Sequence, residues 1–256
     1  MKKILFLLLS LFMIFYIFSS CSQKSSEISS PVQMQTTTFY SPTITPTTTI
    51  TQTHTNTPTA TITCTNTNTS TPIIVEIKCI GTSTPFICTN IYDTGIIENY
   101  NNNYGNTKVF SIGVDSASNR RRVLIKFDLS SIPQTAQIID AKLFIYISTF
   151  GAVSNPFYVS AHKINSEWQE TTETWNTHNG GDFSSSESGV VAIASTGSCI
   201  IFLDNALVQG WVNGTIPNNG ILLKQSIENT SLDYIVIEMK ESLEQYRPYL
   251  QVKYIN

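Results

Sequence analysis

Cationic and aromatic side chains alternate with apolar ones in two runs of the sequence, RRRVLIKFDL at 120–129 and AKLFIYI at 141–147. Successive side chains of an extended strand point to opposite faces, so each run would have one apolar face and one mixed face. The mixed faces carry Arg122, Lys126, Lys142, Phe144 and Tyr146. Aromatic rings pack against the C–H faces of sugars, and Lys or Arg pairs with the carboxylate of a uronic acid. If the two strands pair, these side chains would form one ligand-binding surface suited to an acidic polysaccharide.

The last run of this kind, YLQVKYI at 249–255, would extend that surface. By the same alternation, Tyr249, Gln251 and Lys253 share one face. An alternative is that a second sheet covers Phe144 and Tyr146, with the lysine side chains reaching out to the rim. The exposure of these two rings decides between the two interpretations.

Two tryptophans are further candidates for ligand contact. Trp168 and Trp175 lie in EWQETTETWN, among glutamates and threonines. An alternative is that the two rings fix a long loop to the edge of the fold. Trp211 differs, because its apolar neighbours in LVQGWV have the spacing of a short helix that packs on the core.

The sequence offers no grouping that predicts catalysis. Glycoside hydrolysis needs two carboxylates that face each other across the scissile bond, usually from different elements. Glu167, Glu170 and Glu173 lie together in one loop and fit a solvated face better. The histidines, His54, His162 and His178, form no Ser-His-Asp or zinc-binding spacing. We therefore expect a protein that is not an enzyme.

Oxygen-rich segments raise the question of a structural metal ion. The segment NYNNNYGN at 99–106, Asp115 and Asp128 offer amide and carboxylate oxygens of the kind that Ca²⁺ prefers. Their spacing resembles no defined calcium loop. A structural Ca²⁺ is thus an open expectation, and no other cofactor is predicted.

A β scaffold must position these residues, because runs of strand type recur along the chain between turns rich in Gly, Asn and Ser. The runs lie at 72–80, 109–114, 121–129, 141–147, 157–164, 190–195, 199–204, 220–225, 233–239 and 249–255. Many short strands with such turns are typical of an all-β sandwich. One short helix is predicted at 204–213, with Asp204 as its N-cap and Gly214 as its stop, and a second helical turn at 241–246.

Several blocks of sequence, taken in order, resemble a known family. They are NNNYGNTKVFSIGVDSASNRRRVLIKFDLSSIP, EWQETTETWN, LVQGWVNGTIPNNGILLK and the terminal RPYLQVKY. This order resembles the DNRLRE-domain family, also described as carbohydrate-binding module family 96, over about residues 90–256. The resemblance implies a jelly-roll-like β-sandwich with an accessory, non-catalytic role on secreted or cell-surface proteins, some members binding alginate. A structural or adhesive surface domain without a sugar site is the alternative.

The N-terminus predicts export. Lys2 and Lys3 precede an apolar run at 4–18, and two serines then lead to Cys21. This arrangement resembles a bacterial lipoprotein signal, which implies a lipid on Cys21 and a membrane contact through it; an ordinary cleaved signal is the alternative. We expect a protein of the bacterial cell envelope, facing outward, or a secreted one.

The segment after the signal differs in composition from the rest of the chain. Residues 21–72 are rich in Thr, Ser and Pro, and they alternate threonine with mixed residues so that neither face is apolar. Such a segment cannot bury enough surface to fold alone, so we expect a disordered, stalk-like spacer. The predicted domain boundaries are 1–20 for the signal, 21–72 for the stalk, 73–89 for a short strand or hairpin lead-in and 90–256 for the sandwich.

Cysteine placement and charge complete the sequence evidence. In an oxidising compartment, Cys79 and Cys88 could close a hairpin across GTSTPFI by a disulfide, while Cys64 and Cys199 stay free. The formal net charge of −3 argues against a nucleic-acid partner, which would require a basic excess. A polysaccharide is the partner that the residues favour.

Overall fold

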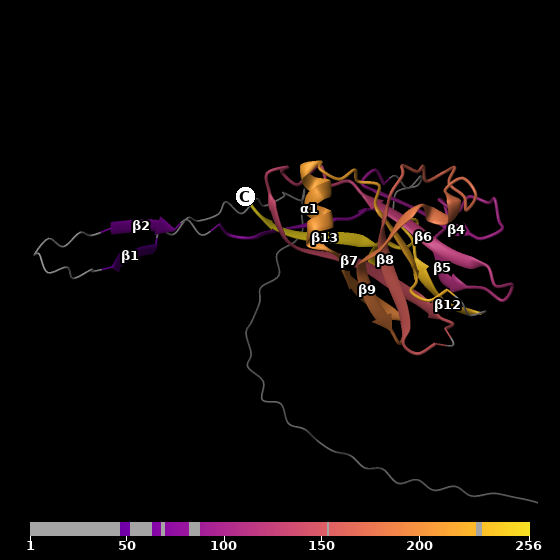
Figure 1. Cartoon of the computed structure of the whole chain (residues 1–256). Coiled ribbons are helices and arrows are strands. Elements are labelled where there is room, and N and C mark those ends of the chain that lie inside the picture. Colours follow the sequence, from indigo (N-terminus) through magenta and orange to yellow (C-terminus); the bar gives the residue numbers. More distant parts are fainter. Residues whose placement is uncertain (1–46, 52–62, 68–69, 82–87, 153, 229–231) are drawn as a thin grey trace, which may run out of the picture. The chain divides into compact units, whose positions relative to one another are not determined.

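The computed structural model describes residues 47–51, 63–67, 70–81, 88–152, 154–228 and 232–256 (Figure 1). The strands are β1 Thr47–Thr51, β2 Thr63–Thr67, β3 Ile73–Ile77, β4 Ile91–Ile97, β5 Val109–Val114, β6 Arg120–Phe127, β7 Gln137–Phe150, β8 Phe157–Ile164, β9 Phe183–Ile193, β10 Gly197–Phe202, β11 Ile221–Gln225, β12 Asp233–Glu238 and β13 Tyr249–Ile255. The helical elements are α1 Asn205–Asn213 and the 3-10 turns η1 Asn179–Gly181 and η2 Glu244–Tyr246.

Strand alternation explains which residues form the core. Along β7, β12 and β13, buried apolar side chains alternate with partly exposed ones, as expected for strands with one face on a core. The buried faces of β7 and β13 meet those of β6, β8 and β11 in one hydrophobic cluster. By contrast, every residue of β11 is buried, because Leu222 packs into a second, smaller cluster on the opposite face.

The sheet is antiparallel and curls on itself. Its strands follow the order β3-β13-β7-β12-β5-β6-β11-β8-β9, with β10 also paired to β7 and β4 to β6. The last strand of this path, β9, approaches the segment after β10, since the Asp204 amide donates to the Ser188 carbonyl on β9, at 2.7 Å. The predicted all-β, jelly-roll-like sandwich is confirmed.

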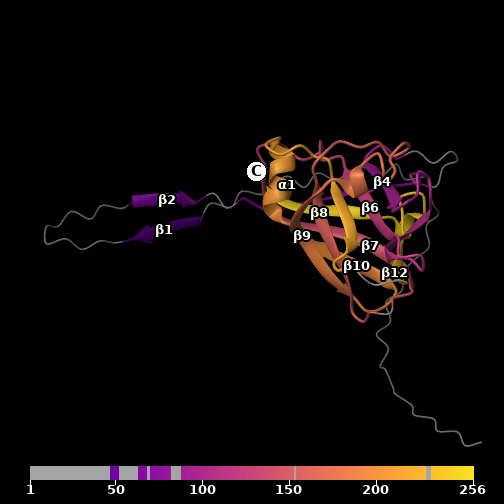
Figure 2. The ribbon, with the colours of Figure 1, turned by 45° about the vertical axis from the view of Figure 1, so that its right-hand side comes forward.

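The short helix α1 lies beside this sheet rather than within it (Figure 2). Its N-cap is Asp204, whose side chain accepts from the Ala206 amide at 2.9 Å, and Gly214 ends it in the left-handed conformation. Trp211 is buried in the main core. The Gln209 side chain also accepts from the Ile138 amide, at 2.9 Å, which ties the helix to the start of β7.

Several boundaries differ from the sequence prediction. The Ser-rich stretch GGDFSSSESG, expected to be a turn, contains the first half of β9, because its backbone pairs with β8, Ile164 lying opposite Phe183. The lead-in at 73–89 contributes β3, which pairs with β13 within the main sheet. The structure joins Cys79 to Cys88 by a disulfide, with Cα atoms 5.5 Å apart, and Cys199 is free.

The threonine-rich segment contains the two short strands β1 and β2. They pair with each other in antiparallel register, Thr47 opposite Thr67 and Thr51 opposite Thr63. These two runs therefore differ from the unpaired chain expected there, because alternating threonine favours extended backbone and each strand supplies a partner for the other. The signal at 1–20 and Cys21 lie outside the described residues, as does most of 21–72. Within the described part of the chain, no helix has the length and apolar character needed to cross a membrane.

Candidate ligand-binding surface

The runs at 121–129 and 141–147 do not pair with each other, so the condition for one shared surface is not met. β6 pairs with β4, β5 and β11, whereas β7 pairs with β10, β12 and β13. Alternation fixes which side chains share a face of one strand, but it does not fix which strands become neighbours. The candidate residues consequently divide into two groups, one on β7 and one on β6.

The first group forms an exposed aromatic surface. Phe144 on β7 lies opposite Tyr249 on β13, and their rings stack with centroids 4.3 Å apart and planes 6° apart. Tyr146 packs on Tyr246 of η2, also at 4.3 Å. On the other side of β7, Phe202 of β10 is 61% exposed. We call Phe144, Tyr146, Phe202, Tyr246 and Tyr249 the aromatic platform.

Two pairs of platform rings pack against each other and are partly buried as a result. Phe144 and Tyr146 are of intermediate exposure; the ring of Phe144 stacks on Tyr249, and the ring of Tyr146 packs on Tyr246. No strand among the described residues covers them as a second sheet would. Neither ring belongs to the hydrophobic cluster that forms the main core.

Polar and charged groups border the platform. The Lys142 ammonium lies 2.6 Å from the Asp140 carboxylate and 5.4 Å from the centroid of the Phe202 ring. Gln251 lies opposite Lys142 on β13, and its amide donates to Glu76 at 3.2 Å. The predicted addition of Tyr249 and Gln251 to the face of Lys142 is thus what the strand register gives.

A hollow of about 490 Å³ adjoins the platform at Tyr249, lined also by Glu76, Lys78, Glu244, Gln245 and Arg247. A hydrogen bond from Lys78 lowers the pKa of Glu76. Burial, followed by the nearby Glu76 carboxylate, raises the pKa of Tyr249. The phenol of Tyr249 therefore keeps its proton at neutral pH and is available as a hydrogen-bond donor.

The second group lies beneath the loop at 165–182. Trp168 from this loop packs with Leu124 of β6 and Leu222 of β11 in the smaller hydrophobic cluster. Trp168 is 6% exposed, and its indole N–H donates to the Asn219 carbonyl at 2.8 Å. Trp175 packs against the same cluster and remains partly exposed. The two tryptophans thus hold the loop on the outer face of β6.

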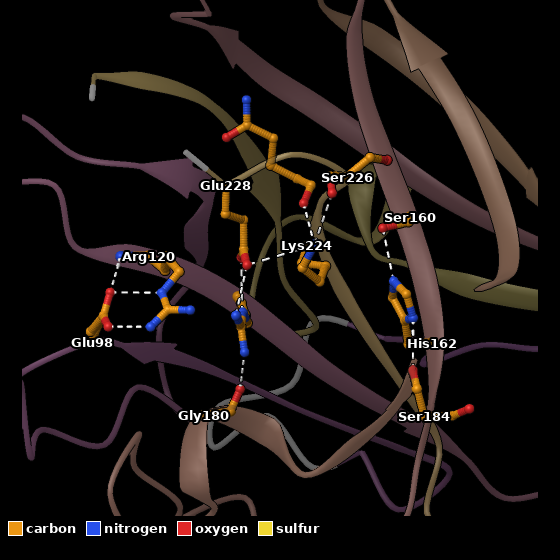
Figure 3. A network of polar contacts seen from close by, with 11 residues as sticks. Glu98, Arg120, Ser160, His162, Gly180, Ser184, Lys224, Ser226 and Glu228 are labelled. Carbon is orange, nitrogen blue, oxygen red and sulfur yellow. Dashed lines mark hydrogen bonds and ion pairs between the residues drawn. The ribbon is translucent and has the colours of Figure 1, made fainter. Parts of the chain in front are cut away.

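Arg122 is buried on this face. Figure 3 shows a network of polar contacts in which Glu228, Lys224 and Gly180 are labelled. Arg122 Nε and Nη2 donate to the two carboxylate oxygens of Glu228, at 2.8 and 2.6 Å, and Nη1 donates to the Gly180 carbonyl. Its guanidinium also lies 4.7 Å from the Trp175 ring. The prediction that Arg122 lies on an open surface is wrong, because the loop at 165–182 covers it and the fold engages its donors.

We call the outer face of β6 beneath the loop at 165–182 the loop-covered face. Lys126 and Trp175 lie at its border and are partly exposed. The Lys126 ammonium lies 5.1 Å from the ring of Tyr92, which is exposed, and 5.6 Å from the Trp168 ring. Arg120 lies 5.2 Å from the Trp175 ring, on which Arg122 also packs. The cations of this face therefore lie beside aromatic rings. Of these rings, Trp168 is buried, Trp175 is partly exposed and Tyr92 is exposed.

Comparison of the sequence with models of known protein families identifies the family of this chain. The family model of carbohydrate-binding module family 96 matches residues 88–254. The chain belongs to carbohydrate-binding module family 96. No curated protein matches the chain. The family 96 module thus extends from just before β4 to the end of β13, and a carbohydrate-binding role is its functional class.

The titratable groups of the loop-covered face of the family 96 module serve its structure. His162 Nδ1 lies 2.9 Å from the Ser184 carbonyl and Nε2 lies 2.9 Å from the Ser160 hydroxyl. Because a carbonyl only accepts, Nδ1 carries the proton and Nε2 accepts. Burial lowers the pKa of His162, and burial likewise lowers that of Lys224, which lies 3.6 Å from Glu228. The His162 imidazole and the Ser160 hydroxyl are both buried, so their contact lies inside the fold and not at an accessible surface.

The residues expected to bind Ca²⁺ are engaged in local turns of the module. Asp115 accepts from the amides of Ala117 and Asn119 and pairs with Arg121 at 3.2 Å. Asp128 accepts from the Ser130 amide at 2.9 Å. Asp115 and Asp128 thus have partners within their own turns, and a structural Ca²⁺ at these residues or at the segment 99–106 stays a prediction.

A further hollow of about 600 Å³ lies at β5 and β12, lined by Tyr104, Phe110, Tyr234 and others. Its charged lining groups, Arg121 and Asp115, are paired with each other. The hollow consequently presents aromatic edges without an available cation, and it fits an acidic polysaccharide less well than the aromatic platform does.

Sequence reasoning missed Phe202 and Tyr246 as members of the platform. Phe202 joins it because β10 pairs with β7 in a register that sets Phe202 opposite Lys142. Tyr246 joins it from the turn before β13. Alternation along β10 does place Ile200 and Phe202 on one face, and this was the signal that could have indicated the first of them.

Proposed function

We propose that the aromatic platform binds an extracellular polysaccharide chain and that the protein is a non-catalytic carbohydrate-binding module. The observation that carries this proposal is the exposure of rings from three adjacent strands on one sheet face, with Lys142 among them. Three strands spaced about 4.8 Å apart extend the rings over roughly 10 Å. A sheet face that carries partly exposed rings suits a polymer that runs past it rather than a small molecule that is enclosed.

Lys142 makes an acidic polysaccharide the preferred ligand class. Its ion pair with Asp140 is partly exposed, with side-chain exposures of 28% and 31%. Ion pairs at such positions contribute about 0–1 kcal/mol to the stability of the fold, so a uronate carboxylate can replace Asp140 as the partner of Lys142 at little cost. Lys142 can also keep its contact with the Phe202 ring while it does so, since an ammonium has three donors.

The test compares substitutions of two lysines that lie on different faces of the fold, Lys142 on β7 and Lys126 on β6. Lys142→Ala removes a cation from the aromatic platform, and Lys126→Ala removes the same charge from the loop-covered face. Affinity electrophoresis on alginate and pectin should show weaker retention for Lys142→Ala and near wild-type retention for Lys126→Ala. Phe144→Ala should weaken retention further, because the sugar would lose its packing on this ring and Tyr249 would lose its stacking partner.

The outcomes separate the candidate functions. Equal retention of wild type, Lys142→Ala and Phe144→Ala would show that the protein binds the polysaccharide at a site other than the aromatic platform. A lack of retention of the wild type on alginate, pectin and chitin oligomers would instead favour the structural or adhesive interpretation. We expect no turnover of these polymers, which reducing-end assays measure directly.

We also propose that the module is displayed on the outside of a bacterial cell through a lipid on Cys21, with residues 22–72 as a spacer. The support is the order of Lys2, Lys3, the apolar run at 4–18 and Cys21. Mass spectrometry of the mature N-terminus tests this proposal. A diacylglyceryl mass on Cys21 is expected, and an unmodified start beyond Cys21 would contradict it.

A further inference from the structure

Three carboxylates from distant parts of the chain meet at the edge strand β4. Asp93 comes from β4, Glu170 from the loop at 165–182, and Glu241 from the turn that follows β12. One oxygen from each lies within 4.8 Å of those of the other two. We call these three residues the carboxylate cluster.

Two oxygens of the carboxylate cluster are buried without a partner. Asp93 is 1% exposed, and its Oδ2 accepts from the Lys240 amide at 2.8 Å. No donor among the described residues lies within hydrogen-bond distance of Asp93 Oδ1 or Glu241 Oε2. A buried carboxylate oxygen without a partner is costly, and such atoms are usually satisfied in folded proteins. The cluster therefore has acceptor capacity that the protein itself does not use.

Lys240 balances only part of the charge of the carboxylate cluster. Its ammonium lies 3.1 Å from Glu170 Oε1 and contacts Glu241 Oε1. Three ionised carboxylates and one ammonium would leave two negative charges in a mostly buried space. Either a proton or a further cation must therefore accompany Asp93.

We propose that Asp93, Glu170 and Glu241 bind one calcium ion. Carboxylate oxygens are the donors that hard divalent cations prefer. Ca²⁺ takes oxygens at roughly 2.3–2.6 Å, so two ligands of one ion can be about 5 Å apart, whereas the shorter bonds of Mg²⁺ limit this separation to about 4.2 Å. The oxygens of the cluster all lie within 4.8 Å of one another, a separation that a calcium ion can bridge. Water completes the six to eight ligands of calcium.

The bound calcium ion would join three segments of the fold. Glu170 already accepts from the Asp93 amide at 2.9 Å, and its own carbonyl accepts from the Asn103 side chain at 2.7 Å. A metal ion bound to Asp93, Glu170 and Glu241 would add a strong link between β4, the loop that carries Trp168, and the turn after β12. The role that follows is to stabilise the loop-covered face, separately from the aromatic platform.

The test measures calcium binding to the purified protein after treatment with a chelator. Isothermal titration with CaCl₂ should show one site, and calcium at about 100 times its Kd should raise the Tm by roughly 5–10 °C. MgCl₂ should give a smaller rise. Calcium affinity should fall as pH falls, because protons then compete for the carboxylates.

Two variants with opposite expected effects decide the assignment. Asp93→Asn keeps an acceptor for the Lys240 amide but removes a charged ligand, so it should abolish the calcium-dependent rise in Tm. Asp128→Asn, which makes the same change at an exposed position, should keep it. Lys240→Gln removes the competing ammonium and should bind calcium several-fold more tightly than wild type.

The proposal is overturned by a wild-type protein that neither binds calcium in the titration nor gains thermal stability from it. A full calcium response in Asp93→Asn, or an unchanged affinity in Lys240→Gln, would also overturn it. If Asp93→Asn fails to fold, Glu241→Gln carries the same test, because Glu241 is less buried. In each of the negative cases a proton on Asp93, rather than a metal ion, accompanies the buried carboxylates.

Discussion

The sharpest stability prediction concerns Glu228, the acidic partner of Arg122. The side chains of this pair are 6% and 7% exposed, and Arg122 donates two hydrogen bonds to the carboxylate of Glu228. Glu228→Gln would keep the shape of the side chain but leave the buried guanidinium without its counter-charge. Breaking a buried pair from one side costs about 3–5 kcal/mol, because the remaining charge is left uncompensated. Lys224, 3.6 Å away, would lose its acidic neighbour as well.

The chain provides a matched control for this change. Arg120 and Glu98 form the same two-point contact, with Nε to Oε2 at 2.8 Å, but their side chains are 39% and 21% exposed. Glu98→Gln should cost only about 0–1 kcal/mol, since water replaces the lost carboxylate. Burial is thus the main difference between the two substitutions.

Urea unfolding followed by tryptophan fluorescence measures both effects. With an m-value of roughly 2–3 kcal/mol per molar urea, Glu228→Gln should lower the unfolding midpoint by about 1–2 M, and Glu98→Gln by less than about 0.5 M. The m-values should stay equal if the denatured state is unchanged. Equal shifts for the two variants would refute the reasoning that burial sets the value of the Arg122 pair.

Two further predictions concern stability under changed conditions. Because burial lowers the pKa of His162 in the folded state, its neutral form stabilises the fold at a pH above the unfolded-state pKa of about 6.5, and this contribution is lost as the pH falls below that value. His162→Gln should therefore show a smaller loss of Tm between pH 7 and pH 5 than wild type, and an identical loss would contradict this role. Reduction of the Cys79–Cys88 disulfide, which closes a loop with a sequence separation of 9, should cost roughly 2–3 kcal/mol. The double variant Cys79→Ala, Cys88→Ala should show the same lowered Tm with and without reductant, and a further drop on reduction would point to another disulfide.

The sequence predicted the faces of single strands well, because alternation is a local property. Lys142, Phe144 and Tyr146 lie on the outer face of β7 as expected, and Leu143 and Ile145 lie in the core. The predicted strands at 109–114, 157–164 and 249–255 coincide with β5, β8 and β13. Local signals also placed the caps of α1, since an Asp N-cap and a Gly stop act through the neighbouring backbone.

What the sequence could not predict depends on contacts between distant segments. Arg122 alternates correctly onto the outer face of β6, yet it is buried because a loop more than 40 residues later folds over it and brings Trp175 against its guanidinium. The carboxylate cluster is a stronger case, since the amide of Lys240 and the side chain of Asp93 are 147 residues apart in the chain. No periodicity in either segment indicates the other.

The position of β3 has a mechanical consequence. β3 is the first strand of the main sheet along the chain, and among the described residues it pairs with β13 alone, through five residue pairs from Ile73 to Ile77. Any tension that pulls on the chain from its N-terminal side must enter the fold through this ladder. β13 is also the strand that carries Tyr249, so a polymer held on the platform and a force on the N-terminal side would load the same strand. The path of that force would run across two neighbouring strands at one end of the sheet.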